Sequence, residues 1–171
     1  MAWEITAEEL LARYEKGERN FAGVDLNPMC DNEWIPLARA DLRGINLRGA
    51  NLYRANFGHS NLSGADCFGA YLGHAGLGCA NLSGTNLRGA ILSYSYWGNT
   101  DLSGADLTDA KLTGAVLVEA NLTGAILERA YLINTNLRGV IFDGRAVDTT
   151  NALFWHTTMP DGSVKIDPTY G

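Results

Sequence analysis

The chain has 171 residues and a net charge of −6, but residues 40–144, with seven bases and eight acids, contribute only −1. This length is sufficient for one domain with a substantial core. A nearly neutral central region disfavours nucleic-acid binding, which needs a basic surface. No apolar run approaches the roughly 18 residues of a membrane-spanning helix, so we expect neither nucleic acid nor membrane as a partner.

The N-terminal segment has the pattern of a short helix. Thr6 and Glu9 are spaced as a capping box, apolar residues follow, and Gly17 is a stop signal. We therefore expect a helix over residues 6–16. The start of the chain is acidic and mixed in polarity, without the basic and apolar parts of a signal peptide, so a cytoplasmic location is expected.

An insertion follows this helix. Phe21 and Leu26 keep a spacing of five, but the step from Leu26 to Leu37 is one residue longer than two such spacings. The segment 27–36, NPMCDNEWIP, is therefore interpreted as a bulge or loop that shifts the phase of the pattern.

A period of five residues then runs through residues 40–144. Of the 21 central positions from 42 to 142, 17 are Leu, and of the 21 positions two residues earlier, 14 are Ala. Residues two apart on an extended segment face the same side, so the small residue and the Leu face inward. The next two residues, often ending in Gly, form a corner because Gly tolerates unusual dihedral angles. The chain therefore winds into stacked coils around a leucine core.

The period fades after Phe142, and the end of the chain is expected to cap the array. Leu153, Phe154 and Trp155 supply apolar side chains, and a Pro-Asp-Gly turn follows at 160–162.

The repeats ADLRG, ANLSG, ADLTD and ANLTG resemble the consensus A-(D/N)-L-x-x of the pentapeptide-repeat family, and the opening EELLARYEKGERNFAGVDL resembles the leader of many cyanobacterial members. This resemblance implies an all-β fold, a right-handed four-sided β-helix with 20 residues per coil, here with a short N-terminal α-helical cap. The parts of the chain are then the helical cap 1–18, the irregular first repeats 19–39, the β-helix 40–144, and the C-terminal cap and tail 145–171.

In a coil of this length, residues 20 apart in the sequence stack in columns. The column Asn46, Asp66, Asn86, Asp106, Ile126 alternates charged and neutral residues, as close stacking requires. Trp97 takes the place of an inward Leu without a small residue opposite, so it either strains the core or tips outward.

No catalytic motif is present, and we expect neither an enzyme nor a cofactor. The segment GHAGLG, 73–78, has the glycine spacing of a phosphate loop, but its glycines occupy repeat positions.

Metal binding is not expected either. One corner column consists of His59, Cys79, Asn99 and Glu119, but a flat column spreads its side chains too far apart for the four short bonds of zinc. The three cysteines fit no zinc spacing and are expected as reduced thiols: Cys30, Cys67 and Cys79.

Outward-facing tyrosines and branched residues gather on two adjacent sides of the expected coil. Such patches often mark binding sites, although strand faces favour these residue types in general. The candidate interaction surface consists of Tyr53, Tyr71, Ile91, Tyr94, Tyr96, Val116, Val118, Tyr131 and Ile133.

We therefore expect a non-enzymatic interaction or regulatory protein that binds an unidentified protein partner, as a monomer or homodimer. The family resemblance supports this, because some cyanobacterial members act in regulation by protein contact. The alternative is a DNA-mimicking inhibitor of DNA gyrase, since similar quinolone-resistance members inhibit that enzyme with a strongly acidic surface. The nearly neutral repeat region is a poor copy of a row of phosphates.

Overall fold

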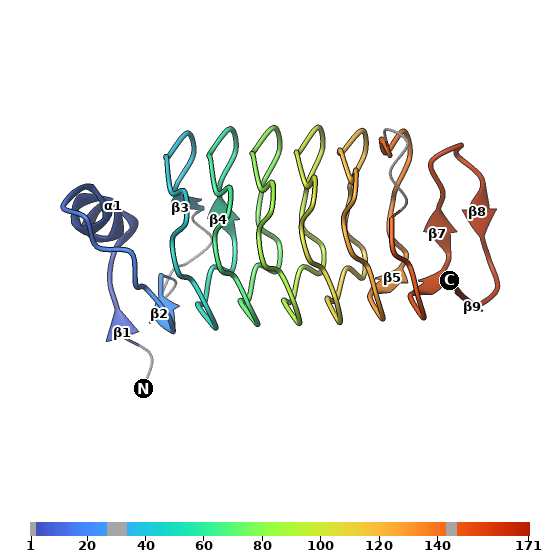
Figure 1. Ribbon diagram of the computed structural model, residues 1–171, viewed down its shortest axis with the longest axis horizontal. Helices are drawn as coiled ribbons and strands as arrows, with labels where there is room; N and C mark the ends of the chain where they lie inside the picture. The colour runs from blue at the N-terminus through green and yellow to red at the C-terminus, as the bar shows by residue number, and fades with distance from the viewer. Residues whose placement is uncertain (1–2, 27–33, 143–146) are drawn as a thin grey trace.

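The computed structural model describes residues 3–26, 34–142 and 147–171. Figure 1 shows a row of stacked coils, with a helix at the N-terminal end and short paired strands at the C-terminal end. No helix within the described residues is long and apolar enough to cross a membrane.

Regular elements are short in the described part of the chain. They are β1 Trp3–Glu4, α1 Ala7–Glu15, β2 Val24–Asp25, β3 Ile35–Pro36, β4 Ala55–Asn56, β5 Tyr131–Ile133, β6 Leu153–Trp155, β7 Thr157–Thr158, β8 Val164–Lys165 and β9 Thr169–Tyr170. The pairs β1–β2, β3–β4 and β5–β6 are parallel, whereas β6–β9 and β7–β8 are antiparallel.

Between Asp41 and Ile141 the coils are joined by parallel bridges between residues 20 apart. These bridges form four columns, which pass through Asp41, Asn46, Asn51 and Asn56. The second column contains Asn46, Asp66, Asn86, Asp106 and Ile126, so the predicted stacking is confirmed. Each side of a coil contributes only one bridged residue. A single bridge is too short to form a strand, so the central coils contain few strands.

The core consists of the inward Leu and Ala side chains, as the five-residue period predicts. Trp97 also faces inward and is fully buried, which settles the orientation that the sequence left open. Its indole N–H donates to the Ser95 hydroxyl, which in turn donates to the carbonyl of Leu92. Ser95 occupies a position that is usually Ala, so this substitution supplies the hydrogen-bond acceptor that a buried Trp needs.

Helix α1 covers the N-terminal end of the stack (Figure 1). The Thr6 side chain accepts a hydrogen bond from the Glu9 N–H at 3.1 Å, and Leu10 is buried against the core. Beside it the Trp3 ring stacks on Phe21, with ring centroids 6.0 Å apart. At the opposite end, β6 pairs with β5 and buries Phe154.

The register shows how long the insertion is. Asp25 pairs with Asn51 and Ile35 pairs with Ala55, so the first pairing spans six residues more than the second. Six residues are therefore inserted before Ile35, so the step of 11 residues from Leu26 to Leu37 is one repeat plus a six-residue insertion that shifts the phase. Spacing alone could not distinguish one extra residue from six, because the two differ by one whole repeat. Of the predicted loop segment 27–36, residues 27–33 lie outside the described residues.

Candidate interaction surface

The nine predicted surface residues lie on two adjoining sides of the coils. On one side, bridges connect Tyr71, Ile91, Lys111 and Tyr131 in a column, and on the next side a bridge connects Tyr96 with its neighbour Val116. We call these two sides the aromatic half of the coils, which comprises residues 51–60, 71–80, 91–100, 111–120 and 131–140. The polar half comprises residues 41–50, 61–70, 81–90, 101–110 and 121–130.

Four rings form a continuous ladder across three coils of the aromatic half. Tyr53 stacks on Tyr71, with centroids 5.4 Å apart and 8° between the planes. Tyr53 and His74 also meet edge to face, with centroids 5.4 Å apart, and His74 stacks on Tyr94 with centroids 5.3 Å apart. The three tyrosines belong to the surface predicted from the sequence, whereas the histidine that connects them does not.

Trp34 is a further aromatic residue that the sequence analysis missed. Its ring lies over Gly76, where a Cβ added to the glycine would meet Trp34 Cζ3 at 3.0 Å. Tyr96 lies in the same way over Gly78, whose added Cβ would meet Tyr96 Cε1 at 3.0 Å. Neither glycine has a positive φ, so the backbone would accept a side chain there. The absence of these side chains makes room for the two rings.

Trp34 and Tyr96 line two adjoining depressions, which together we call the aromatic groove. The first, about 380 Å³, is also lined by Arg54, His74, Ala75 and Tyr94. The second, about 620 Å³, is also lined by Asn56, Gly58, His59, Gly76 and Gly78. The groove is therefore aromatic on its walls and contains glycine backbone in its floor.

The groove side chains remain well exposed. Tyr94 is 62% exposed, Trp34 55% and Tyr96 51%. Of the other predicted residues, Tyr131 is exposed but is separated from Tyr71 by two coils, and four are half-buried: Ile91, Val116, Val118 and Ile133. The structure thus brings Tyr53, Tyr71 and Tyr94 together in the ladder of rings and Tyr94 and Tyr96 together in the groove, and it places the remaining five outside both.

In residues 41–100 the corners of the coils differ between the two halves, whereas in residues 101–140 both halves mix glycine and other residues at their corners. The corner residue of each described side has a left-handed φ, whether or not it is glycine. In residues 41–50, 61–70 and 81–90 all six corners are glycine: Gly44, Gly49, Gly64, Gly69, Gly84 and Gly89. In residues 51–60, 71–80 and 91–100 none is, and the six are Arg54, His59, His74, Cys79, Tyr94 and Asn99, with φ between 57° and 60°.

A left-handed φ costs a non-glycine residue roughly 1–2 kcal/mol. The aromatic half therefore holds backbone strain at the corners where its side chains are presented. Strain of this kind tends to concentrate at functional sites. The missing corner glycines were visible in the sequence and are the signal that would have located this face.

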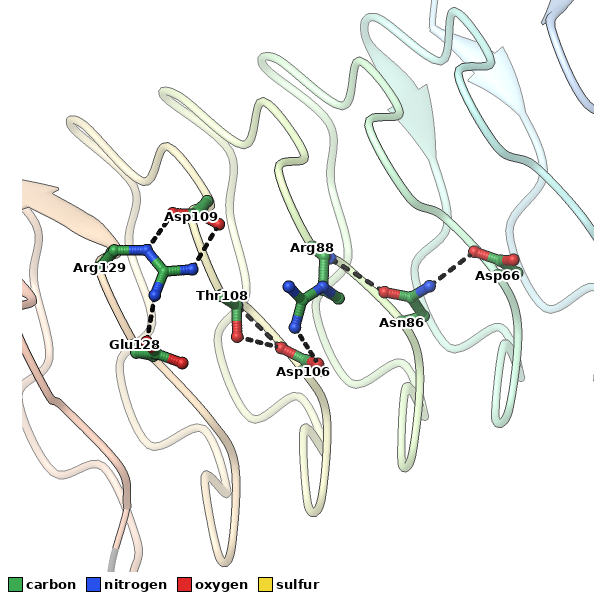
Figure 2. Close-up of polar contacts among 8 residues, drawn as sticks. All are labelled: Asp66, Asn86, Arg88, Asp106, Thr108, Asp109, Glu128 and Arg129. Carbon is green, nitrogen blue, oxygen red and sulfur yellow. Dashed lines mark hydrogen bonds and ion pairs between the residues drawn. The ribbon is translucent and has the colours of Figure 1, made fainter.

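The polar half carries paired charges (Figure 2). Arg88 contacts Asp106 at 3.2 Å, and Arg129 donates to both carboxylate oxygens of Asp109 at 2.7 and 2.9 Å. The hydrogen bond from Arg129 lowers the pKa of Asp109, although desolvation partly opposes it. These contacts are those of an ordinary solvated surface, with each of these carboxylates beside a guanidinium.

The corner column considered for metal binding contains His59, Cys79, Asn99 and Glu119. The described residues contain no group of three or more His, Cys, Asp or Glu side chains placed to hold a metal ion. Cys67 is buried, which raises the pKa of its thiol to about 12, whereas Cys79 is exposed, and neither forms a disulfide. Cys30 lies outside the described residues.

Comparison with known proteins identifies the repeats. A family model described as pentapeptide repeats matches eight copies, over residues 37–66, 65–104, 80–118 and 100–139. No curated protein matches the chain significantly. Among solved structures, the chain is similar to Rfr23, a pentapeptide repeat protein from the cyanobacterium Cyanothece 51142, with 26% identity over 83% of this chain and 99% of that one and a TM-score of 0.64.

Two further solved structures are similar over most of the chain, but with low TM-scores. HetL, a pentapeptide repeat protein involved in heterocyst differentiation regulation in the cyanobacterium Nostoc sp. strain PCC 7120, is 24% identical over 94% of this chain and 100% of that one, with a TM-score of 0.28. QnrB1, a plasmid-mediated fluoroquinolone resistance protein, is 17% identical over 86% and 79%, with a TM-score of 0.33.

Proposed function

We propose, from the premise that this chain belongs to the pentapeptide-repeat family, that it is a non-enzymatic interaction protein whose partner binds the aromatic groove. In this proposal the stacked coils are the right-handed, four-sided β-helix of the family, and they serve as a rigid support for the groove. A regulatory role, a cytoplasmic location and a monomeric or homodimeric state remain predictions.

One observation carries the proposal: the strained corners and the aromatic cluster coincide. Glycine is the low-strain choice at every corner, and the polar half uses it at all six corners between residues 41 and 90. The aromatic half forgoes it at all six corners between residues 51 and 100. Four of these corners line the groove: Arg54, His59, His74 and Tyr94. Selection for stability alone would favour glycine there, so the side chains themselves support a binding role.

The composition and order of the groove fit a protein interface. Trp, Tyr and Arg are the residues that contribute most often to the binding energy of such interfaces. Here two groove rings are held before a partner arrives, because His74 and Tyr94 stack on each other and His74 also contacts the ring of Tyr53. Rings held in place lose little conformational entropy on binding, which favours affinity.

The alternative, a DNA-mimicking inhibitor of DNA gyrase, is weaker in this structure. Mimicry of DNA needs a row of unneutralised negative charges. Asp66, Asp106 and Asp109 of the polar half each contact an arginine: Arg48, Arg88 and Arg129, respectively. A gyrase supercoiling assay decides this alternative directly, and we expect no inhibition.

Affinity co-purification from a source-like cell lysate tests the proposal. The bait is the full chain, compared with a Tyr71→Arg, Tyr96→Arg double variant. Phe68→Arg is the matched control, because Phe68 is an equally exposed aromatic residue on the polar half. We expect a partner that wild type and the control retain and the double variant loses. A partner retained by all three would place the binding site elsewhere and reject the proposal.

A further inference from the structure

We infer that the partner presents an acidic peptide segment with aromatic or aliphatic side chains to the aromatic groove, an inference that rests on the function proposed above. The apolar part of this chemistry follows from the walls of the groove. Trp34, Tyr94 and Tyr96 are each more than half exposed, and together they offer ring faces to a ligand rather than to the core.

The acidic part follows from the distribution of charge. The aromatic half contains three bases, Arg54, Lys111 and Arg138, and one acid, Glu119, which gives a net charge of +2. The rest of the chain contains the remaining ten bases and 18 acids, a net charge of −8. One half of the coils is therefore positive in a protein whose overall charge is −6. This asymmetry favours the approach of a negatively charged segment to that half.

The side chains that line the groove also include basic groups but no described acidic ones. Its described ionisable side chains other than tyrosine are Arg54, His59 and His74, and no described Asp or Glu lines it. A cationic ligand bound by aromatic rings would be stabilised further by a nearby carboxylate, but no carboxylate is present among the described residues that line the groove. Carboxylates of a peptide would instead meet N–H donors from the imidazoles of His59 and His74, and hydrogen bonds to a charged carboxylate are strong ones.

Single-stranded nucleic acid also binds to aromatic and basic surfaces, but the charge of this chain argues against it. Proteins that bind nucleic acid neutralise many phosphates and are basic as a whole. A net charge of −6 repels a polyanion, whereas a short peptide with a few carboxylates needs only the local positive charge of one face. The groove therefore fits an acidic peptide better than a nucleic acid.

The test is a selection of random dodecapeptides displayed on phage, on the full chain and on a Trp34→Ala, Tyr96→Ala double variant. Phe68→Ala serves as the matched control, since it removes an exposed ring from the polar half. We expect wild type and the control to enrich the same peptides, which combine Asp or Glu with aromatic or aliphatic residues, and the double variant to lose them. The most enriched peptide is then synthesised with a fluorescent label, together with a counterpart in which Asp and Glu are replaced by Asn and Gln.

Fluorescence anisotropy with these two peptides measures the contribution of charge. We expect the amide counterpart to bind at least about tenfold more weakly than the acidic peptide. Enrichment of neutral or basic peptides, or equal affinity of the two synthetic peptides, would overturn the acidic inference and leave the groove itself as a binding site. A twelve-residue oligodeoxythymidine, titrated in parallel, is expected not to bind, and binding that the double variant loses would overturn the inference in favour of nucleic acid.

Failure of the inference is distinguishable from failure of the proposed function. If no peptide is enriched on wild type over the double variant, the acidic-peptide inference is wrong. The co-purification experiment then decides the proposed function independently, since a folded partner lost only from the Tyr71→Arg, Tyr96→Arg variant would still place binding on the aromatic half.

Discussion

The ring of Tyr96 lies against the backbone of Gly98, so closely that a Cβ added to the glycine would meet Tyr96 Cζ at 2.5 Å. Gly98 has no positive φ, and its backbone does not require glycine. The glycine is therefore explained by the ring above it, which lies over Gly78 as well and forms one wall of the aromatic groove.

Gly98→Ala is predicted to displace the Tyr96 ring while the fold remains intact. Tyr96 is half exposed and can turn toward solvent, so the free energy of unfolding should change by no more than about 0.5 kcal/mol. Retention of a co-purified partner should fall to the level of a Tyr96→Ala variant. Urea unfolding and quantitative co-purification measure the two effects, and partner retention equal to that of wild type would contradict the role of this contact.

Cys79→Gly is predicted to stabilise the protein. Cys79 is an exposed corner residue with φ 58°, a conformation that glycine adopts without steric cost. We expect the free energy of unfolding to rise by about 0.5–1 kcal/mol, which is the steric cost less the extra chain entropy of glycine.

The reverse substitution at a corner of the polar half is the control for this prediction. Gly84 has φ +63° and open space around its added Cβ, so Gly84→Ala tests backbone strain without a steric clash. It should lower the free energy of unfolding by about 1 kcal/mol. Urea unfolding of the three proteins gives the comparison, and equal stabilities would mean that the corners carry no strain.

Leu107→Asp is predicted to unfold the array or to destabilise it by more than about 4 kcal/mol, because Leu107 is fully buried and the new carboxylate would have no partner. The neighbouring Asp106→Asn faces outward and should cost roughly 1 kcal/mol or less, since it weakens an exposed contact with Arg88. Circular dichroism during thermal unfolding measures both. Similar melting temperatures for the two variants would show that the inward and outward positions are assigned wrongly.

The contact between Asp109 and Arg129 is predicted to contribute stability only while Asp109 is ionised. The hydrogen bond from Arg129 lowers the pKa of this carboxyl below its unfolded value of about 3.9. Its contribution is therefore fully present above that unfolded value and is lost as pH falls through the lower pKa of the folded state. The difference in free energy of unfolding between wild type and Asp109→Asn should accordingly shrink as pH falls from 7 to below 4.

Asn is a suitable replacement in this experiment because Asp109 has a left-handed φ of 60°, which Asn also tolerates. Arg129→Gln removes the other partner and should show the same pH dependence relative to wild type. A difference that stays constant from pH 7 to pH 3 would rule out the linkage.

The sequence by itself determined the coil and its inward and outward faces. Leu recurs every five residues, with a small residue two places earlier. Residues two apart on an extended segment face the same side, so both must face inward to be buried. The structure confirms this orientation at Leu107 and at the equivalent Leu positions. It also indicated the two sides that contain Tyr53, Tyr71, Tyr94 and Tyr96. These properties are local, because each repeat specifies its own side and corner.

Only the tertiary structure decided which outward residues meet. Trp34 is distant from Gly76 in the sequence, and its position over that glycine depends on the register set by an insertion whose length the five-residue spacing could not give. The edge-to-face contact of His74 with Tyr53 and its stacking on Tyr94 likewise depend on how successive coils are aligned. A repeat pattern fixes the direction of each side chain, but the groove arises from contacts across coils, where the orientation of each ring is set by the presence or absence of its neighbours' side chains.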